Sequence, residues 1–490
     1  MAGKFIKAFS PFVRVMPEIK QPQREVSFKE KFVWTAVVLV IYLIMSNIPL
    51  YGVQLEESTD YFYWLRVILA SQRGTLTELG IGPIVTAGLI MQLLNGSKMI
   101  DIDMNNPYDR SMFSGSQKVL AIFLTIFNSI AYLVGGAFGP MAQLGLQNAV
   151  LIFLQLLFAG IIIILLDELL QKGWGLGSGV SLFIAAGVAG QIFWNAFSFI
   201  EAPGQGGLQR GVVIAFFTVI FDGDPTTNLD DLFFRTGGLP SLLGVITTVI
   251  IFLIVVWFES TRIEIPLQYA GYRGFKGKYP IKLLYVSNIP VILVNALYAN
   301  ILFFGQLLAG PRSGLRGQGY DFWLDLIGTF EATDAGGQVG GRLVPQSGLI
   351  YLLSPPQGLE ALTADPIRAV IYLIIFIFLC VLLGQVWVEV SGLAPKDIAG
   401  QIIDSGMQVP GFRRSEKIIE RILKRYIPTL IILNGMIIAI LSFFADGLGA
   451  LTSGTGLLIS IGIVHQYAET ISKEVAAEQY PGMRGFLGLD

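Results

Sequence analysis

The chain has 490 residues, of which 53% are hydrophobic and only 14% are charged, and its mean hydropathy is +0.65. Soluble domains carry charge on about a quarter of their residues, so this composition excludes one soluble core and indicates a polytopic membrane protein. The net charge of −2 excludes a nucleic-acid binder driven by bulk charge, the single Cys380 excludes a disulfide framework, and the single His465 excludes most zinc and histidine chemistry.

Ten apolar stretches are long enough to cross the roughly 30 Å hydrocarbon layer of a membrane. Each is predicted to be helical, because an unpaired backbone cannot face lipid. The predicted fold class is therefore an all-α membrane protein with ten transmembrane helices. In chain order the predicted spans cover residues 32–50, 79–95, 117–138, 146–167, 178–199, 239–258, 284–308, 367–388, 426–445 and 448–468.

Residues 1–31 are too long and too polar for the lead of a signal peptide, and no small-residue cleavage site follows Ser46-Asn47-Ile48-Pro49. We therefore expect a retained first span. Phe5, Ile6 and Phe9 alternate with basic residues, a pattern that fits an interfacial amphipathic helix or a solvated tail. After the first span, the apolar stretch from Phe62 to Ala70 is too short to cross the membrane, so it fits a plug-like or an interfacial segment.

The distribution of Lys and Arg predicts the orientation. If the N-terminus is cytoplasmic, the cytoplasmic segments carry 25 of the 33 cations and the external segments carry eight. Two of these loops, 259–283 and 391–425, are long, basic and rich in turns. Their charge satisfies the positive-inside rule, and it equally suits docking of an acidic partner or an RNA backbone.

A weak internal repeat divides the chain into two halves. Leu176–Ala189 and Leu451–Val464 share six identities in fourteen positions, and Pro83-Ile84-Val85 resembles Pro290-Val291-Ile292. These pairs match spans two and five with spans seven and ten, and an odd number of spans per half requires opposite insertion. Inverted repeats place the functional path between the halves. Chance recurrence of Gly-Ser-Gly starts is the alternative.

The predicted organisation follows from this repeat and from the charge distribution. Residues 1–31 form a cytoplasmic N-terminal segment and residues 471–490 a cytoplasmic tail. The first half covers 32–200, an external loop covers 201–238, and the second half covers 239–470.

Acidic residues near the spans, Asp167-Glu168, Glu259, Glu389 and Asp446, all fall near span ends, which disfavours a proton- or ion-coupled transporter. The sequence has no HExxH motif or paired catalytic acids, and the GLGSG run at 175–179 lacks the lysine of a phosphate loop, so an enzyme is disfavoured. No cofactor is expected. A small-molecule transporter remains the alternative, and it would need a polar pocket at the midplane.

Four motifs resemble the SecY family, the large subunit of the Sec protein-conducting channel. They are GTLTELGIGPIVTAGLIMQLL (74–94), LLDELLQKGWGLGSGVSLFIAAG (165–187), YPIKLLYVSNIPVIL (279–293), and RYIP (425–428) with LGALTSGTGLL (448–458). The loop VPGFRRSEK (409–417) is closest to archaeal members. The resemblance implies two inverted five-helix halves, an hourglass pore between them, and passive conduction of unfolded secretory polypeptides.

The resemblance also implies a constriction ring of aliphatic side chains. A narrow aliphatic ring dewets and blocks ions, and it offers a passing chain nothing to bind. The internal repeat independently pairs Ile184 with Ile459 and Val85 with Ile292. Val180 departs from the isoleucine that is usual in the family. The implied ring consists of Ile81, Val85, Val180, Ile184, Ile292 and Ile459.

Further sites are implied by the resemblance alone. A plug at about 62–74 would include Phe62, Leu65, Val67, Ile68, Leu69 and Gly74. A lateral gate between spans two, three, seven and eight would carry the polar cluster Thr86, Asn128 and Asn300. Cytosolic partners such as the ribosome would meet Arg273, Lys276, Lys278, Arg413 and Arg414.

The resemblance implies partners and a location as well. The expected partners are SecE/gamma-type and beta-type small subunits, the ribosome with its nascent chain or signal sequence, and membrane lipids. No DNA binding is expected, and contact with ribosomal RNA is left open. The location would be the plasma membrane in an archaeon and the endoplasmic reticulum membrane in a eukaryote.

Overall fold

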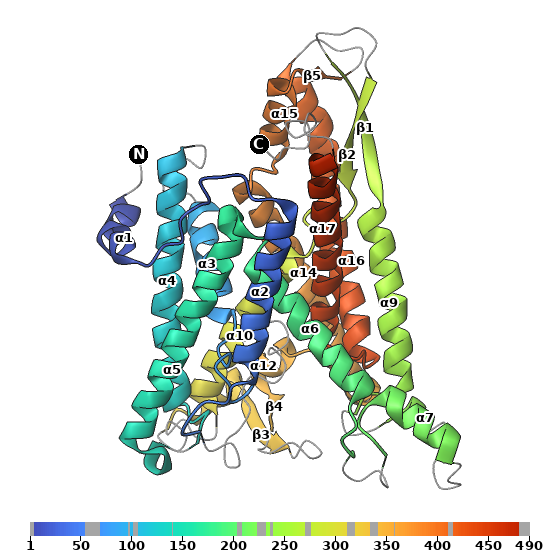
Figure 1. Ribbon diagram of the computed structural model, residues 1–490. Coiled ribbons are helices and arrows are strands. Elements are labelled where there is room, and N and C mark those ends of the chain that lie inside the picture. The colour runs from blue at the N-terminus through green and yellow to red at the C-terminus, as the bar shows by residue number, and fades with distance from the viewer. Residues whose placement is uncertain are drawn as a thin grey trace.

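The computed structural model describes residues 4–53, 69–96, 99–100, 106–139, 141–202, 208–222, 232–235, 239–269, 276–310, 319–333, 342–356, 358–409 and 415–479. Ten of its helices occupy the predicted spans and run roughly side by side (Figure 1). They are α2 (Phe28–Asn47), α3 (Gly82–Gly96), α4 (Pro107–Val134), α5 (Met141–Leu169), α6 (Gly179–Phe197), α9 (Leu242–Ser260), α10 (Ile289–Ala309), α14 (Pro366–Val390), α16 (Glu416–Gly447) and α17 (Gly454–Gln479).

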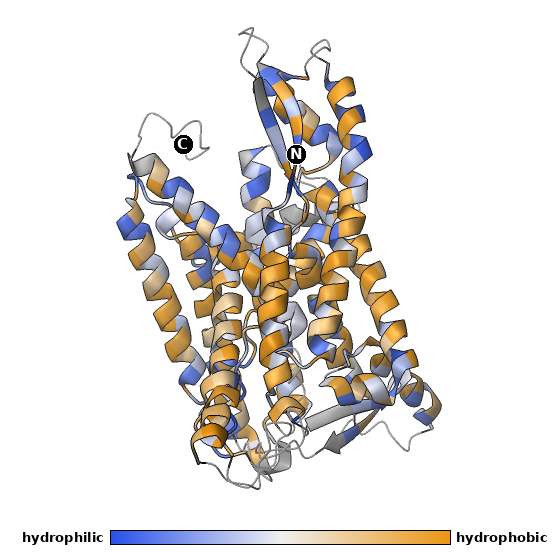
Figure 2. Ribbon diagram, turned by 90° about the vertical axis from the view of Figure 1, so that its right-hand side faces the viewer, coloured by the Kyte–Doolittle hydropathy of each residue, from blue (hydrophilic) through white to orange (hydrophobic). Residues whose placement is uncertain are grey.

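Seven of these helices are by themselves long and apolar enough to cross a membrane, namely α4, α5, α6, α9, α10, α14 and α16, as far as the described residues go. The other three helices, α2, α3 and α17, are shorter or more polar. Helix α3 has only 15 residues, α2 begins with charged residues, and the last part of α17 is polar. Figure 2 shows helices that are hydrophobic over most of their length, with hydrophilic residues toward their ends. The protein is a multi-pass membrane protein.

Shorter elements gather at the two ends of the bundle (Figure 1). One end carries the antiparallel hairpin of β1 (Arg262–Tyr269) and β2 (Lys276–Lys282), with β5 (Met407–Gln408) paired to β1 and α15 (Pro395–Asp404) beside it. We call this the hairpin end. The opposite end carries α7 (Val212–Asp222), α11 (Asp321–Ile327), β3 (Thr329–Thr333), β4 (Arg342–Ser347), α12 (Gly348–Leu353) and α13 (Gly358–Ala364).

Helices near the hairpin end are longer than the predicted spans. Helix α16 begins at Glu416, ten residues before the predicted start, and α17 continues to Gln479. The segment 391–425, which the sequence predicts to be a turn-rich loop, contains α15 and this first part of α16. Hydropathy predicts only the part of a helix that faces lipid. The first part of α16 shares an apolar cluster with β1 and β2, and α17 is joined to these strands by the ion pairs of Glu469.

The N-terminal segment forms helix α1 (Lys4–Val15), which packs on α4 where Val13 covers Gly115. The chain that follows is held against the first half by ion pairs. Glu18 accepts a hydrogen bond of 2.6 Å from Lys172, and this bond and the positive charge of Lys172 hold the pKa of Glu18 below its usual range. Lys118 bonds Glu168 and the main-chain carbonyl of Pro17. The segment is therefore docked rather than a free tail.

Candidate functional site

The largest buried apolar cluster contains residues of both halves, α2–α6 and α9–α17, and all six residues of the predicted ring belong to it or pack against it. Each ring residue stands at or near the beginning of its helix in α3, α6, α10 or α17. Aliphatic residues from the starts of helices in both halves therefore belong to or border one apolar cluster. Ile81, Ile184 and Ile459 are fully buried, and Val85, Val180 and Ile292 are partly buried and pack against the same cluster.

The segment that ends at α3 approaches the ring from one side. The backbone N–H of Ile81 donates to the carbonyl of Leu69 over 2.8 Å, and the hydroxyl of Tyr42 donates to the carbonyl of Ala70 over 2.6 Å. Gly80 has φ +53°, and a Cβ there would lie 2.0 Å from the Leu69 carbonyl oxygen. Only glycine permits this approach. Of the predicted plug, Leu69 and Gly74 are described, and Phe62, Leu65, Val67 and Ile68 lie outside the described residues.

The predicted polar cluster is assembled in part. The side-chain amide of Asn300 on α10 donates to the hydroxyl of Thr86 on α3 over 3.2 Å and to the carbonyl of Ala296 over 2.6 Å. Asn128 lies half-buried on α4, and no hydrogen bond that the structure describes joins it to this pair. The Thr86–Asn300 contact crosses from the first half to the second, at what we call the front seam (α3 and α4 against α10 and α14).

The opposite junction, the back seam (α2 and α6 against α17), has more polar contacts. Near the hairpin end, the Tyr467 hydroxyl donates to the main-chain carbonyls of Leu176 (3.2 Å) and Ser178 (3.1 Å). At the other end of α6, Asn195 donates to the carbonyl of Leu451 over 2.7 Å. Two further contacts are side chain to side chain: Thr452 with Gln191 over 2.7 Å, and the ion pair of Lys31 with Glu474.

Aromatic contacts add to the front seam. Phe127 and Phe304 have ring centroids 6.1 Å apart, and the rings of Tyr132 and Phe303 are 5.6 Å apart. Such contacts are less directional than hydrogen bonds, and their partners can be exchanged for other apolar groups at small cost. The described side-chain hydrogen bonds between the halves thus lie mainly along the back seam.

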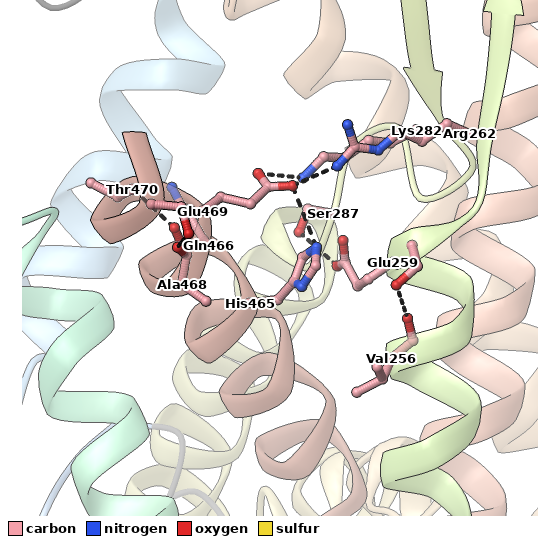
Figure 3. A network of polar contacts seen from close by, with 12 residues as sticks. Val256, Glu259, Arg262, Lys282, Ser287, His465, Gln466, Ala468, Glu469 and Thr470 are labelled. Carbon is pink, nitrogen blue, oxygen red and sulfur yellow. Dashed lines mark hydrogen bonds and ion pairs between the residues drawn. The ribbon is translucent and has the colours of Figure 1, made fainter. Parts of the chain in front are cut away.

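A polar network joins the hairpin to α17 (Figure 3). Glu469 accepts 2.9 Å hydrogen bonds from Arg262 of β1 and Lys282 of β2. Burial raises the pKa of Glu469, but the hydrogen bond from Lys282 and the charges of Lys282 and Arg262 outweigh it and leave this pKa below its usual range. The sequence did not predict this network, because Lys282 and Arg262 stand 187 and 207 residues before Glu469. From the sequence, these two cations indicated only the membrane orientation.

The same region contacts the ring through Asn288. Its side-chain amide donates to the main-chain carbonyl of Ile459 over 3.4 Å. The main-chain carbonyl of Asn288 accepts from the backbone N–H of Ile292 over 3.1 Å. Asn288 therefore connects the backbones of two ring residues. It belongs to the SNIP run of a motif in which sequence reasoning assigned a role only to Ile292.

Two of the five predicted docking residues, Lys276 and Lys278, are described, and both lie in β2 of the hairpin. Lys278 on β2 is exposed and pairs with Glu264 of β1. Lys276 is the first residue of β2. Arg273, Arg413 and Arg414 lie outside the described residues.

Comparisons with known proteins agree with this architecture. A family model described as SecY matches residues 75–468, and one described as the plug domain of Sec61p matches residues 40–74. A solved protein-conducting channel is 39% identical, with a TM-score of 0.78, and the match covers 96% of this chain and 98% of that one.

Two further structures are similar to the same extent. A SecY protein studied for the role of its plug domain in stabilising the closed channel is 39% identical, with a TM-score of 0.77. Sec61 in the canine ribosome–channel complex from the endoplasmic reticulum is 38% identical, with a TM-score of 0.76. Both matches cover 96% of this chain and 98% of the other.

The contact of Asn288 with α17 depends on Gly462, because a Cβ there would lie 1.8 Å from the Asn288 amide nitrogen. We expect Gly462→Ala to displace Asn288 and to lower the free energy of unfolding by about 1–3 kcal/mol, as overpacked sites do. The matched control is Gly190→Ala on α6, where a Cβ meets nothing within 4 Å and helix propensity favours alanine by about 1 kcal/mol. Thermal unfolding in detergent measures both variants. Equal melting temperatures would contradict the conclusion that the contact between Asn288 and α17 requires glycine at position 462.

Proposed function

Because this chain belongs to the SecY family, we propose that it is the pore-forming subunit of a protein-conducting channel, which passes unfolded secretory polypeptides across the membrane and releases hydrophobic segments into lipid through a lateral gate. The observation that carries the proposal is that six aliphatic residues at the starts of four helices, two from each half, all belong to or pack against one buried apolar cluster. The family conducts proteins and is not a family of enzymes. A small-molecule transporter would need a polar pocket where these side chains pack.

The aliphatic cluster acts as the resting seal. A constriction lined by Val and Ile side chains excludes water, and an ion that entered it would lose its hydration without finding a ligand. A translocating chain passes because the same side chains form no hydrogen bond or ion pair with it. The described end of the proposed plug, residues 69–74, supports the seal, since its carbonyl groups accept hydrogen bonds from Ile81 and Tyr42.

The difference between the two seams supports a lateral gate at the front. Opening the back seam would break directional bonds from Tyr467, Asn195 and Thr452, and each polar group would need a new partner in a non-aqueous setting. Opening the front seam breaks the Thr86–Asn300 bond and exchanges aromatic contacts for contacts with lipid. Interhelical hydrogen bonds in membranes contribute about 0.6 kcal/mol each, so the front opens at lower cost.

The hairpin end is the cytoplasmic docking face in this proposal. The Lys and Arg bias places both termini and the basic loops in the cytoplasm. The ribosome, which the similar canine complex binds, would dock on Arg273, Lys276, Lys278, Arg413 and Arg414 through its phosphates. SecE/gamma-type and beta-type subunits are the further partners of the complex.

Replacing Val85, Ile184 and Ile292 by Asn is expected to make the idle channel conduct ions, because polar side chains hydrate the constriction. Every 1.4 kcal/mol by which the closed state is weakened raises the open population about tenfold. Single-channel recording in planar bilayers measures the effect. The control replaces the same residues by Leu, which keeps the ring apolar. Equal, low conductance of both variants would argue against the ring.

A second prediction distinguishes the roles of the two seams. All variants carry Cys380→Ser, which removes the native cysteine. Thr86→Cys with Asn300→Cys, joined by a short bifunctional thiol reagent, is expected to stop release of a hydrophobic segment into lipid. Gln191→Cys with Thr452→Cys, joined in the same way across the back seam, is expected to leave that release unchanged. Photocrosslinking of a stalled chain to lipid measures both. Undiminished lipid crosslinking with the front seam joined would refute the lateral gate.

A third prediction concerns docking. Arg273→Glu combined with Arg413→Glu is expected to weaken ribosome binding and to reduce the slope of log affinity against log salt by about two, because two phosphates would no longer be neutralised. Lys424→Glu combined with Arg425→Glu, which reverses two exposed cations of α16, is the charge-matched control. Cosedimentation with ribosomes at several salt concentrations provides the measurement. Binding unaltered by the double reversal would leave these loops as topology determinants.

A further inference from the structure

Each half contains one buried acid that binds the start of a helix with predicted ring residues, and the proposed gate does not use either acid. In the first half, Asp167 near the end of α5 is 7% exposed. Its Oδ1 accepts a hydrogen bond from the backbone N–H of Val180 over 3.0 Å and one from the Ser178 hydroxyl over 3.3 Å, and its Oδ2 accepts from Gln171 over 2.8 Å. The carboxylate therefore binds the first turn of α6.

In the second half, Asp446 at the end of α16 is likewise 7% exposed. Its Oδ1 accepts a hydrogen bond of 2.7 Å from the backbone N–H of Gly454, the first residue of α17. The internal repeat aligns Gly454 with Gly179, the first residue of α6. In each half, an acid from the span before the last binds the beginning of the last span.

Both junctions are tight. A Cβ on Gly179 would lie 2.7 Å from the Cα of Asp167, and a Cβ on Gly454 would lie 2.2 Å from the carbonyl oxygen of Ser442 on α16. The backbone of each last span thus begins directly against the preceding helix. A shift along the helix axis would break the carboxylate bond and the close contact together.

The start of a helix leaves backbone N–H groups without partners and carries a partial positive charge, which a carboxylate satisfies better than any neutral group. Most caps come from the residue next to the helix and hold only its first turn. Asp167 and Asp446 belong to another transmembrane helix, so their bonds also fix the height of α6 and α17 within the bundle.

These are two of the helices that carry the ring. Val180 is itself bonded by Asp167, Ile184 lies one turn further along α6, and Ile459 lies in the second turn of α17. The start of α9 provides a contrast: Ser241, its own N-cap, accepts from the N–H of Gly244 over 3.1 Å. Helix α9 carries no ring residue.

We propose that Asp167 and Asp446 are positioning residues of the pore seal, which hold the ring-bearing starts of α6 and α17 at matching heights so that the ring closes. The proposal rests on the proposed role of the aliphatic ring. It assigns to these two acids a mechanical role rather than ion coupling, because the Oδ1 atom of each accepts a hydrogen bond from the backbone at the start of the following helix.

The test compares four variants by idle conductance in planar bilayers and by thermal unfolding. Asp446→Asn keeps an acceptor oxygen in place and is expected to stay sealed. Asp446→Ala removes the bond and is expected to leak. Asp446→Glu keeps the charge but lengthens the side chain by one methylene, so it is expected to fold and to leak. Ser241→Ala, which removes a cap of a helix without ring residues, is expected to lower the melting temperature without a leak. The corresponding Asp167 variants are expected to behave alike.

Sealed channels in both the Ala and the Glu variants would overturn the proposal, and so would a leak in Ser241→Ala equal to theirs. If the Ala variant does not fold, the Glu and Asn pair decides, because equal conductance of these two contradicts a positional role. The triple Asn variant of Val85, Ile184 and Ile292 distinguishes a failure of the positioning role from a failure of the proposed ring. A leak there with tight Asp446 variants rejects the positioning role alone, whereas no leak there rejects the ring itself.

Discussion

One constraint governs the structure around the proposed ring: aliphatic side chains pack into an apolar cluster at the place where four helices begin. A helix start is the most polar part of a helix, because its backbone N–H groups lack partners. Ile81, Val180 and Ile459 nevertheless stand at or close to such starts. A dry seal in this place is stable only if every nearby backbone group is satisfied by something other than water.

The protein meets this constraint with side chains and main-chain carbonyls of neighbouring segments. Asp167 and Asp446 accept from the starts of α6 and α17, and Asn288 donates to the carbonyl of Ile459. The carbonyls of Leu69 and Ala70 accept from Ile81 and Tyr42. Hydrogen bonds therefore hold the segments that carry the predicted ring residues, while the ring side chains themselves stay apolar.

Much of this could be predicted from the sequence. Hydropathy predicts all ten spans, and the repeat pairs ring positions in the two halves, because both signals are local and need no knowledge of packing. The partners of Glu469 and of Asp446 could not be predicted. Glu469 pairs with residues about two hundred positions away, and the partner of Asp446 is a backbone N–H, which no side-chain pattern reveals. When only the position along the chain is known, an acid at the end of a span indicates the membrane boundary and gives no sign of its bonding partner.

The helix lengths have a related explanation. Composition marks where a helix meets lipid, so hydropathy predicts that α16 and α17 end near the membrane surface, yet both continue into the hairpin end. Their polar extensions are supported by tertiary contacts such as the Glu469 ion pairs. This extension has a mechanical consequence, because a rigid helix that carries Ile459 at one level and Glu469 at another transmits displacement between them. A partner bound to the hairpin would therefore shift the proposed seal only if it binds more tightly when α17 is displaced than when α17 is at rest. Such a difference can arise at the contacts of Arg262 and Lys282 with Glu469.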